Sequence, residues 1–292
     1  WHGWANRQTQ SLCKAYEVIP KEKWLISAKQ EAVSFYTYLL TSQMLGAMKP
    51  EPVVYEQIAY TVSPIVEGLL ELASVTKEKE WSKLAGIAAS WFLGNNPHKI
   101  LMYDSSNGRC FDGLTSSSKV NLNSGAESTI EALMSIIDVE LNPIARKYLF
   151  AKAISFRPSY ELSVTSDKKQ YQFVIHQGGK YLCYLYFKDM RDDTILKINN
   201  KKVKITKNSS YPKVYLVPDH FQFGSGKQKL ILNNPKSIER IIFQPLVQSK
   251  VLLNNNKTLI LIRDCQKQQV LLREDQKCYK IGRKLKWVKK QE

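Results

Sequence analysis

Three carboxylates lie within a polar stretch of the sequence and are the side chains best suited to acid–base chemistry. They are Asp104, Asp112 and Glu127. Hydrolysis of a glycosidic bond needs a carboxylic acid that protonates the leaving oxygen and a carboxylate that acts as base or nucleophile. We therefore predict that these three residues are the catalytic candidates.

Two of these carboxylates have structural alternatives. Ser124 and Glu127 have the spacing of a capping box, in which the glutamate folds back onto the first amide of a helix. Asp112 precedes Gly113, a pair that is common in turns. Both alternatives stay open from the sequence.

Aromatic, amide and charged side chains near these carboxylates are typical of sugar recognition, because aromatic faces cover sugar rings and polar groups bind hydroxyls. The residues predicted to bind substrate are Trp4, Asn6, Glu56, Trp91, Asn95, Tyr103, Arg109 and Asn123. The five cysteines show no CxxC spacing, so we predict no metal site and no cofactor. Their odd number slightly favours a reducing, cytoplasmic compartment, although no localisation signal is visible.

The first half of the chain has the apolar periodicity of helices. The predicted helices are 6–18, 21–45, 56–74, 77–92, 124–139 and 142–154, with a long polar loop over 94–123. Short alternating runs punctuated by glycine and asparagine follow from about residue 158 and predict antiparallel strands. The expected fold class is therefore α+β with two domains, helical hairpins over 1–156 and a β-sandwich over 157–292 with basic C-terminal strands.

Several runs in the helical half resemble the C-terminal half of six-hairpin, (α/α)6-toroid glycosidase-like domains. They are the run 91–96, the pair 103–104, the triplet 112–114 and the run 123–131. The resemblance implies a cleft lined by interhelical loops, with Glu127 as the acid and Asp112 as its partner. A complete toroid has twelve helices and six are predicted here, so another chain is a candidate source of the missing helices.

Residues 158–247 resemble a carbohydrate-binding jelly-roll module, which implies sugar binding or simple packing against the helices. The favoured function is a glycoside hydrolase acting on a poly- or oligosaccharide. The alternatives are a non-catalytic protein that binds a glycan or an anionic polymer, and a polysaccharide lyase. The net charge of +17 suits an anionic partner. We expect a carbohydrate partner rather than nucleic acid, and no apolar run is long enough to predict a membrane span.

Overall fold

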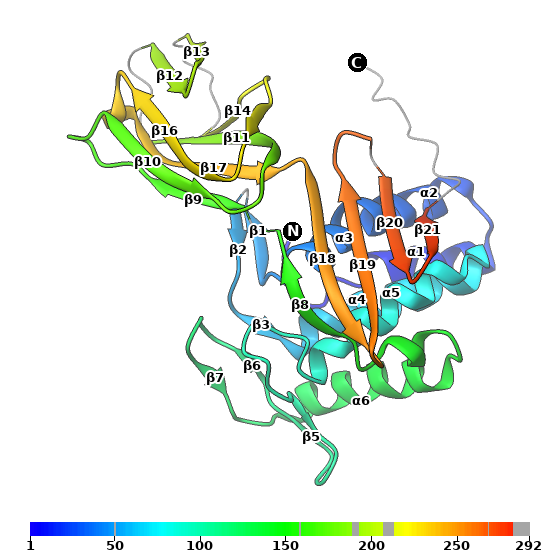
Figure 1. Ribbon diagram of the computed structural model, residues 1–292. Coiled ribbons are helices and arrows are strands. Elements are labelled where there is room, and N and C mark those ends of the chain that lie inside the picture. The colour runs from blue at the N-terminus through cyan, green and yellow to red at the C-terminus, as the bar shows by residue number, and fades with distance from the viewer. Residues whose placement is uncertain (50, 158, 189–192, 207–212, 268, 283–292) are drawn as a thin grey trace. The chain divides into compact units, whose positions relative to one another are not determined.

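The computed structural model divides the chain into two compact units (Figure 1). It describes residues 1–49, 51–157, 159–188, 193–206, 213–267 and 269–282. The helical unit is Trp1–Phe156 together with Gln248–Glu292, and the strand unit is Arg157–Val247. Each unit has its own hydrophobic cluster.

Helices make up most of the first part of the helical unit. They are α1 (Gln8–Val18), α2 (Glu22–Glu31), the π-helix η1 (Ala32–Tyr36), α3 (Thr37–Thr41), α4 (Ala59–Thr76), α5 (Lys79–Ala89), the 3-10 helix η2 (Ser90–Phe92), α6 (Ala126–Leu141) and the 3-10 helix η3 (Ala145–Tyr148). In α4, Val62, Val66 and Leu69 recur at helical spacing and are fully buried. Pro64 lies inside α4 rather than at its start.

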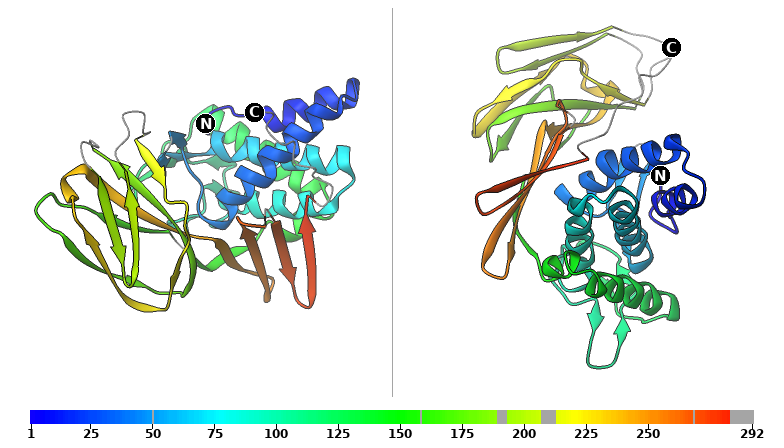
Figure 2. Two further views of the ribbon diagram at one scale, coloured as in Figure 1. Left: turned by 90° about the horizontal axis from the view of Figure 1, so that it is seen from above. Right: turned by 90° about the vertical axis from the view of Figure 1, so that its right-hand side faces the viewer.

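A five-stranded antiparallel sheet completes this unit. Its strands are β8 (Lys152–Phe156), β18 (Val247–Asn254), β19 (Lys257–Asp264), β20 (Gln269–Glu274) and β21 (Lys277–Ile281), in the order β21-β20-β19-β18-β8. The helices lie on one side of the sheet (Figure 2). Alternate residues such as Leu259, Leu261 and Leu272 are fully buried in the same cluster as the helices.

The expected half toroid is wrong. The helices pack on a sheet, and the predicted sixth helix at 142–154 is η3 followed by the strand β8. Asn142 Oδ1 accepts hydrogen bonds from the backbone N–H groups of Ile144 and Ala145, both at 3.0 Å, as a cap should. Pairing of β8 with β18, far away in the sequence, then takes over from local helix propensity.

The predicted β domain 157–292 also differs from the observed division. Strands β18 to β21 pair with one another and with β8, and their buried leucines belong to the helical cluster. The alternating pattern of β18 to β21 predicts strands with one buried face. It does not show whether that face packs against the helices or against the other strands. The chain has a mixed fold of helices and antiparallel sheets.

The long loop between α5 and α6 contains short strands and no helix beyond η2. They are β4 (Tyr103–Asp104), β5 (Arg109–Cys110), β6 (Gly113–Leu114) and β7 (Val120–Asn121). Earlier short strands are β1 (Ala47–Lys49), β2 (Glu51–Val53) and β3 (Gln57–Ile58), the last of which pairs with β6. Backbone pairing thus holds the polar loop in place.

The strand unit consists of two antiparallel sheets. One has the order β10-β16-β12-β13 and the other β14-β11-β17-β9, with β15 paired to β11. The strands are β9 (Tyr160–Ser163), β10 (Gln170–Ile175), β11 (Gly179–Phe187), β12 (Thr194–Ile198), β13 (Lys201–Ile205), β14 (Val214–Leu216), β15 (Phe221–Phe223), β16 (Gly226–Leu232) and β17 (Ile238–Pro245), and the 3-10 helix η4 (Pro235–Ser237) precedes β17. Both sheets contribute buried residues to one hydrophobic cluster. Among the described residues of the chain, no helix has the length and apolar character needed to cross a membrane.

Candidate functional site

A cavity of about 760 Å³ lies within the helical unit, and we call it the amide pocket. Its polar lining is Ser42, Gln43, Gln57, Asn95, Asn96, Lys99, Lys152, Ser155 and Lys250, and its apolar lining includes Leu39, Leu40, Met44, Ile87 and Trp91. These residues come from α3 and the segment after it, from β3, from the end of α5 with η2 and the segment after it, and from the strands β8 and β18. Segments from both ends of the helical unit therefore build one pocket.

Gln57 and Trp91 form a buried polar chain in this pocket. The Trp91 Nε1–H donates to Gln57 Oε1 at 3.2 Å, and Gln57 Nε2 donates to the Met44 carbonyl oxygen at 3.0 Å. Both side chains are almost completely buried, with Trp91 only 1% exposed. Trp91 is therefore a fixed part of the pocket wall and not an open platform for a sugar ring.

The two asparagines after η2 are held by the fold but keep hydrogen-bonding capacity. Asn95 Nδ2 donates to Ser90 Oγ at 2.8 Å, and Asn95 Oδ1 accepts from the Ala153 N–H at 3.0 Å. Asn96 Nδ2 donates to the carbonyl oxygens of Trp91 at 3.0 Å and Ile100 at 2.8 Å. An amide group has two N–H donors and two acceptor lone pairs, so Asn95 retains one of each for a ligand.

Gln43 is the freest amide of the pocket. It is half-buried, and it makes no hydrogen bond to any residue in the described part of the chain. Lys99 and Lys152 add positive charge, burial lowers the pKa of Lys250 to about 8, and none of the pocket's lining residues is Asp or Glu. Neutral amides and cationic amines over an apolar floor suit a polar ligand with an acidic group. The same lining lacks the carboxylate pair that glycoside hydrolysis requires.

Asp112 lies outside this pocket and holds the start of α6. Asp112 Oδ1 accepts from the Gly125 N–H at 2.9 Å and from Ser128 Oγ at 2.7 Å. The unpaired amides at a helix N-terminus stabilise a carboxylate in this position. The geometry therefore gives Asp112 a clear role in folding, while its predicted catalytic role stays a prediction.

Glu127 lies in the first turn of α6 and does not form the capping box. The N-cap residue is Gly125, with no side-chain cap bond, and Ser124 Oγ instead lies 3.3 Å from Thr129 Oγ1. Glu127 is exposed and makes no hydrogen bond or ion pair with a residue that the structure describes. Of the three predicted carboxylates, it is the one that local folding does not use.

Asp104 belongs to the turn between β4 and β5. It accepts hydrogen bonds from the N–H of Ser106 at 2.9 Å, from Ser106 Oγ at 2.6 Å and from Asn107 Nδ2 at 2.7 Å. These bonds, those from Ser106 first, lower the pKa of the Asp104 carboxyl below its ordinary value. A carboxylate bound in this way stabilises the turn and is poorly suited to donate a proton.

The other predicted binding residues are dispersed. Trp91 and Asn95 line the amide pocket, whereas Trp4, Asn6, Glu56, Tyr103, Arg109 and Asn123 do not. Trp4 is 60% exposed, and Arg109 pairs with Asp104 across the β4–β5 hairpin. Gln43, Gln57 and Lys152 also line the pocket but are not among the residues predicted from the sequence. Lys152 lies in a segment whose sequence predicts a helix, so nothing in the sequence indicates its place on a strand beside the pocket.

A buried acid with a half-buried acidic neighbour lies elsewhere in the helical unit. Glu67 of α4 is 5% exposed, and burial together with the neighbouring carboxylate and hydrogen bond of Asp138 raises its pKa to about 8. Nearby, Arg7 Nη2 contacts both carboxylate oxygens of Glu131 at 2.8 and 2.7 Å. Hydrogen-bonded carboxyls are too close to flank a glycosidic bond, since glycosidase pairs are about 5–9.5 Å apart.

Comparison with known proteins assigns the chain to no family. No family model matches the sequence, and no curated protein matches it. A solved structure of an exo-β-1,3-galactanase from Phanerochaete chrysosporium, containing β-1,3-galactotriose, aligns with a TM-score of 0.21 and 18% identity. The alignment covers 29% of this chain and 26% of that chain, and a likeness this slight supports no conclusion about fold or function.

Proposed function

We propose that this chain is a carbohydrate-active protein that binds an acidic oligosaccharide in the amide pocket. The observation that carries the proposal is the composition of this pocket. Four amides, three lysines and an apolar floor line it, and no lining residue is a carboxylate. Amides recognise hydroxyl groups, and lysines recognise a uronate or another acidic substituent.

The dimensions of the pocket fit such a ligand. Its volume of about 760 Å³ lies within the usual range of small-molecule sites, about 300–1,000 Å³. The hydrogen bonds of Asn95 fix this amide before a ligand arrives, which lowers the entropy lost on binding. Binding without turnover is the function that this lining supports best.

For the strand unit we propose a β-sandwich with a structural role. Its two sheets share one hydrophobic cluster, as in sandwich folds. The rings of Tyr181, Phe221, Phe223 and Phe243 are all at most 2% exposed, so they form core and cannot cover a sugar ring. The described part of this unit has no strongly exposed aromatic side chain that would serve as a sugar platform.

Glycoside hydrolysis is the second candidate function, and Glu127 is the observation that favours it. Its carboxylate is exposed and unused by the fold, and it lies between Gly125 and Ser128, both of which bind Asp112. A free carboxylate beside a second one is a necessary feature of such a site. The amide pocket does not contribute to this chemistry.

The test combines a binding assay and a turnover assay on the same panel of neutral and uronate-containing oligosaccharides. We expect saturable binding of a uronate oligosaccharide and no release of reducing ends or unsaturated uronates. Gln43→Ala should weaken binding about tenfold without affecting stability, because Gln43 makes no hydrogen bond within the described chain. The matched control is Gln172→Ala, at an exposed residue of β10.

Two results would overturn the binding proposal. One is binding that is equally strong in Gln43→Ala and wild type. The other is turnover that disappears in Glu127→Gln while the fold stays intact by circular dichroism, which would establish hydrolysis at α6 instead.

A further inference from the structure

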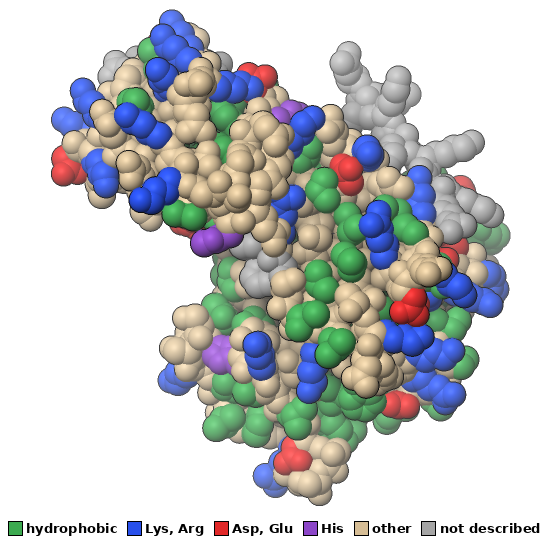
Figure 3. All heavy atoms as spheres, viewed as in Figure 1, with side chains coloured by type: hydrophobic (Ala, Val, Ile, Leu, Met, Phe, Trp, Pro, Cys, Tyr) green, Lys and Arg blue, Asp and Glu red, His purple; other side chains and the backbone are tan. Residues whose placement is uncertain are grey.

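A second pocket of the helical unit is rich in lysine, and we call it the lysine pocket. Its volume is about 690 Å³, and its lining includes Lys79, Lys83, Lys147, Lys257 and Lys277. These come from α5, η3, the start of β19 and the start of β21, so cationic groups surround the space from several sides. Lys and Arg side chains also outnumber acidic ones over the face of the helical unit shown in Figure 3.

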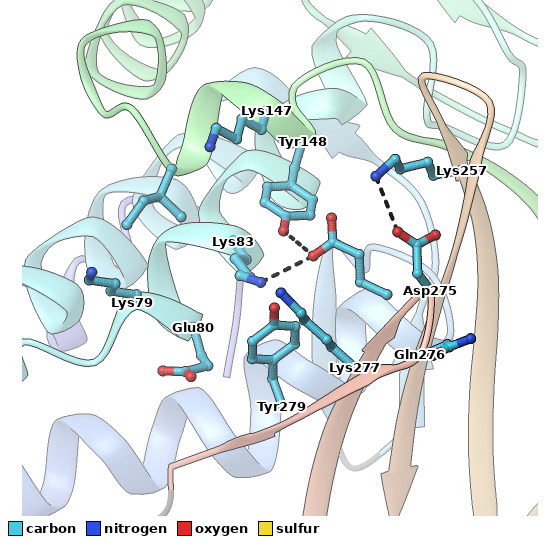
Figure 4. Close-up of a pocket in the computed structure, with 12 residues that line it drawn as sticks. Lys79, Glu80, Lys83, Lys147, Tyr148, Lys257, Asp275, Gln276, Lys277 and Tyr279 are labelled. Atoms are coloured by element: carbon cyan, nitrogen blue, oxygen red, sulfur yellow. Dashed lines mark hydrogen bonds and ion pairs between the residues drawn. The ribbon is translucent and has the colours of Figure 1, made fainter.

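The centre of the pocket is an ordered polar network. Lys83 is 9% exposed, and its Nζ lies 3.1 Å from Glu274 Oε2 and 3.3 Å from the centroid of the Tyr279 ring. Tyr148 Oη donates to the same Glu274 oxygen at 2.7 Å. Figure 4 shows Lys83, Tyr148 and Tyr279 gathered in the middle, with Lys79 and Lys147 on one side and Lys257 and Asp275 on the other.

Positive charge remains after the internal ion pairs are accounted for. Lys83 pairs with Glu274, and Lys257 pairs with Asp275 at 3.1 Å. Lys79, Lys147 and Lys277 have no ion pair with a residue in the described ranges, and they are all exposed. The lining holds one further acid, Glu80. The three lysines outside the ion pairs therefore outnumber the one carboxylate outside them.

From this geometry we infer that the lysine pocket binds a tetrahedral oxyanion, the phosphate or sulfate ester group of a small molecule. Lysine amines are point charges that can surround a tetrahedral oxyanion from different directions. No arginine lines the pocket, although the planar arginine fork is the usual partner of a flat carboxylate. The N-terminal residues of α5 also line it, and the helix dipole adds to the positive potential there. This inference is independent of the proposed saccharide site.

Isothermal titration calorimetry with pyrophosphate as the probe tests the inference. We expect saturable binding at low salt, with a Kd that rises at least about tenfold in Lys147→Gln/Lys277→Gln. Both lysines are exposed, so the variant should fold normally. The matched control is Lys197→Gln/Lys202→Gln, which removes the same charge from an exposed cross-strand pair of the strand unit, and its Kd should change less than about twofold.

The outcomes distinguish binding at the lysine pocket from non-specific attraction to the overall positive charge of the protein. Equal weakening in the two double variants, or no saturable binding to the wild type, would overturn the inference. Parallel titrations with p-nitrophenyl phosphate and p-nitrophenyl sulfate then identify the ester. Tighter binding of either ester that depends on the same two lysines supports the oxyanion site and shows whether it prefers a phosphate or a sulfate ester.

Discussion

The amide pocket and the lysine pocket lie in the same unit and have similar volumes, but they are built on opposite principles. The amide pocket has an apolar floor and amides that the backbone holds in place, with no acidic lining residue. The lysine pocket has five lysines and three carboxylates, two of which hold lysines in ion pairs. The difference predicts that hydrogen bonds from amides and apolar contacts contribute more to binding in the first pocket, and ligand charge more in the second.

Truncation of a wall residue should give the largest contrast between the pockets. Trp91→Ala removes a buried ring and leaves Gln57 Oε1 without its donor, so the free energy of unfolding should fall by about 3–5 kcal/mol. Tyr279→Ala removes a half-buried ring and should cost about 1–2 kcal/mol. Urea denaturation measures both losses of unfolding free energy. Equal losses in the two variants would contradict the view that the amide pocket has a tightly packed wall and the lysine pocket does not.

A site outside both pockets should show the next largest effect. Because Glu67 has a folded pKa of about 8, above its ordinary 4.5, the folded state holds an extra proton between these values. The contribution of Glu67 to stability is therefore full below about pH 4.5 and should be lost progressively as the pH rises from about 4.5 to about 8. Glu67→Gln should flatten this dependence in thermal unfolding scans, and a wild-type profile as flat as that of the variant would contradict it.

Salt should affect the two pockets differently. Raising sodium chloride from about 50 to 500 mM should weaken pyrophosphate binding about tenfold, because the exposed lysines are screened. Binding of a uronate oligosaccharide should weaken only about two- to threefold, since amides and apolar contacts are insensitive to ions. Calorimetry at the two salt concentrations measures both, and parallel losses would show that the amide pocket also depends mainly on charge.

Lowering the pH should have the smallest effect on stability through Glu274. This effect destabilises the fold, whereas the Glu67 contribution is greatest at low pH. Burial alone would raise the pKa of Glu274, but hydrogen bonds from Tyr148 and Lys83 outweigh it and lower that pKa. This carboxylate therefore stabilises the fold above its ordinary pKa, and the contribution of under about 1 kcal/mol is lost as pH falls through its folded value. Lys83→Gln should reduce this loss on acid titration, and an unchanged acid profile would exclude Glu274 as its cause.

The sequence predicted local structure better than the way distant segments come together. Helical periodicity located α4 and α5 to within a few residues, because their buried faces repeat at every turn. The segment 142–154 was misread because the partner of β8 lies about a hundred residues further along the chain.

The candidate site followed the same pattern. Asn95 and Trp91 lie in a conspicuous local run of the sequence, and both line the amide pocket, while their role in binding stays a prediction. Gln43 and Lys152 became pocket residues only through the packing of α3 against the sheet. The polar loop was expected to hold catalytic carboxylates, but Asp104 and Asp112 bind backbone groups that a turn and a helix start leave unpaired.

The most direct test of saccharide binding in the amide pocket uses the indole N–H signals of the six tryptophans in a nitrogen–proton correlation spectrum. The Trp91 signal, assigned with Trp91→Phe, reports on the hydrogen bond to Gln57 inside the pocket. We expect that titration with a uronate oligosaccharide shifts this signal saturably and that pyrophosphate leaves it unchanged. A saccharide that binds without moving the Trp91 signal would contradict the assignment of the site.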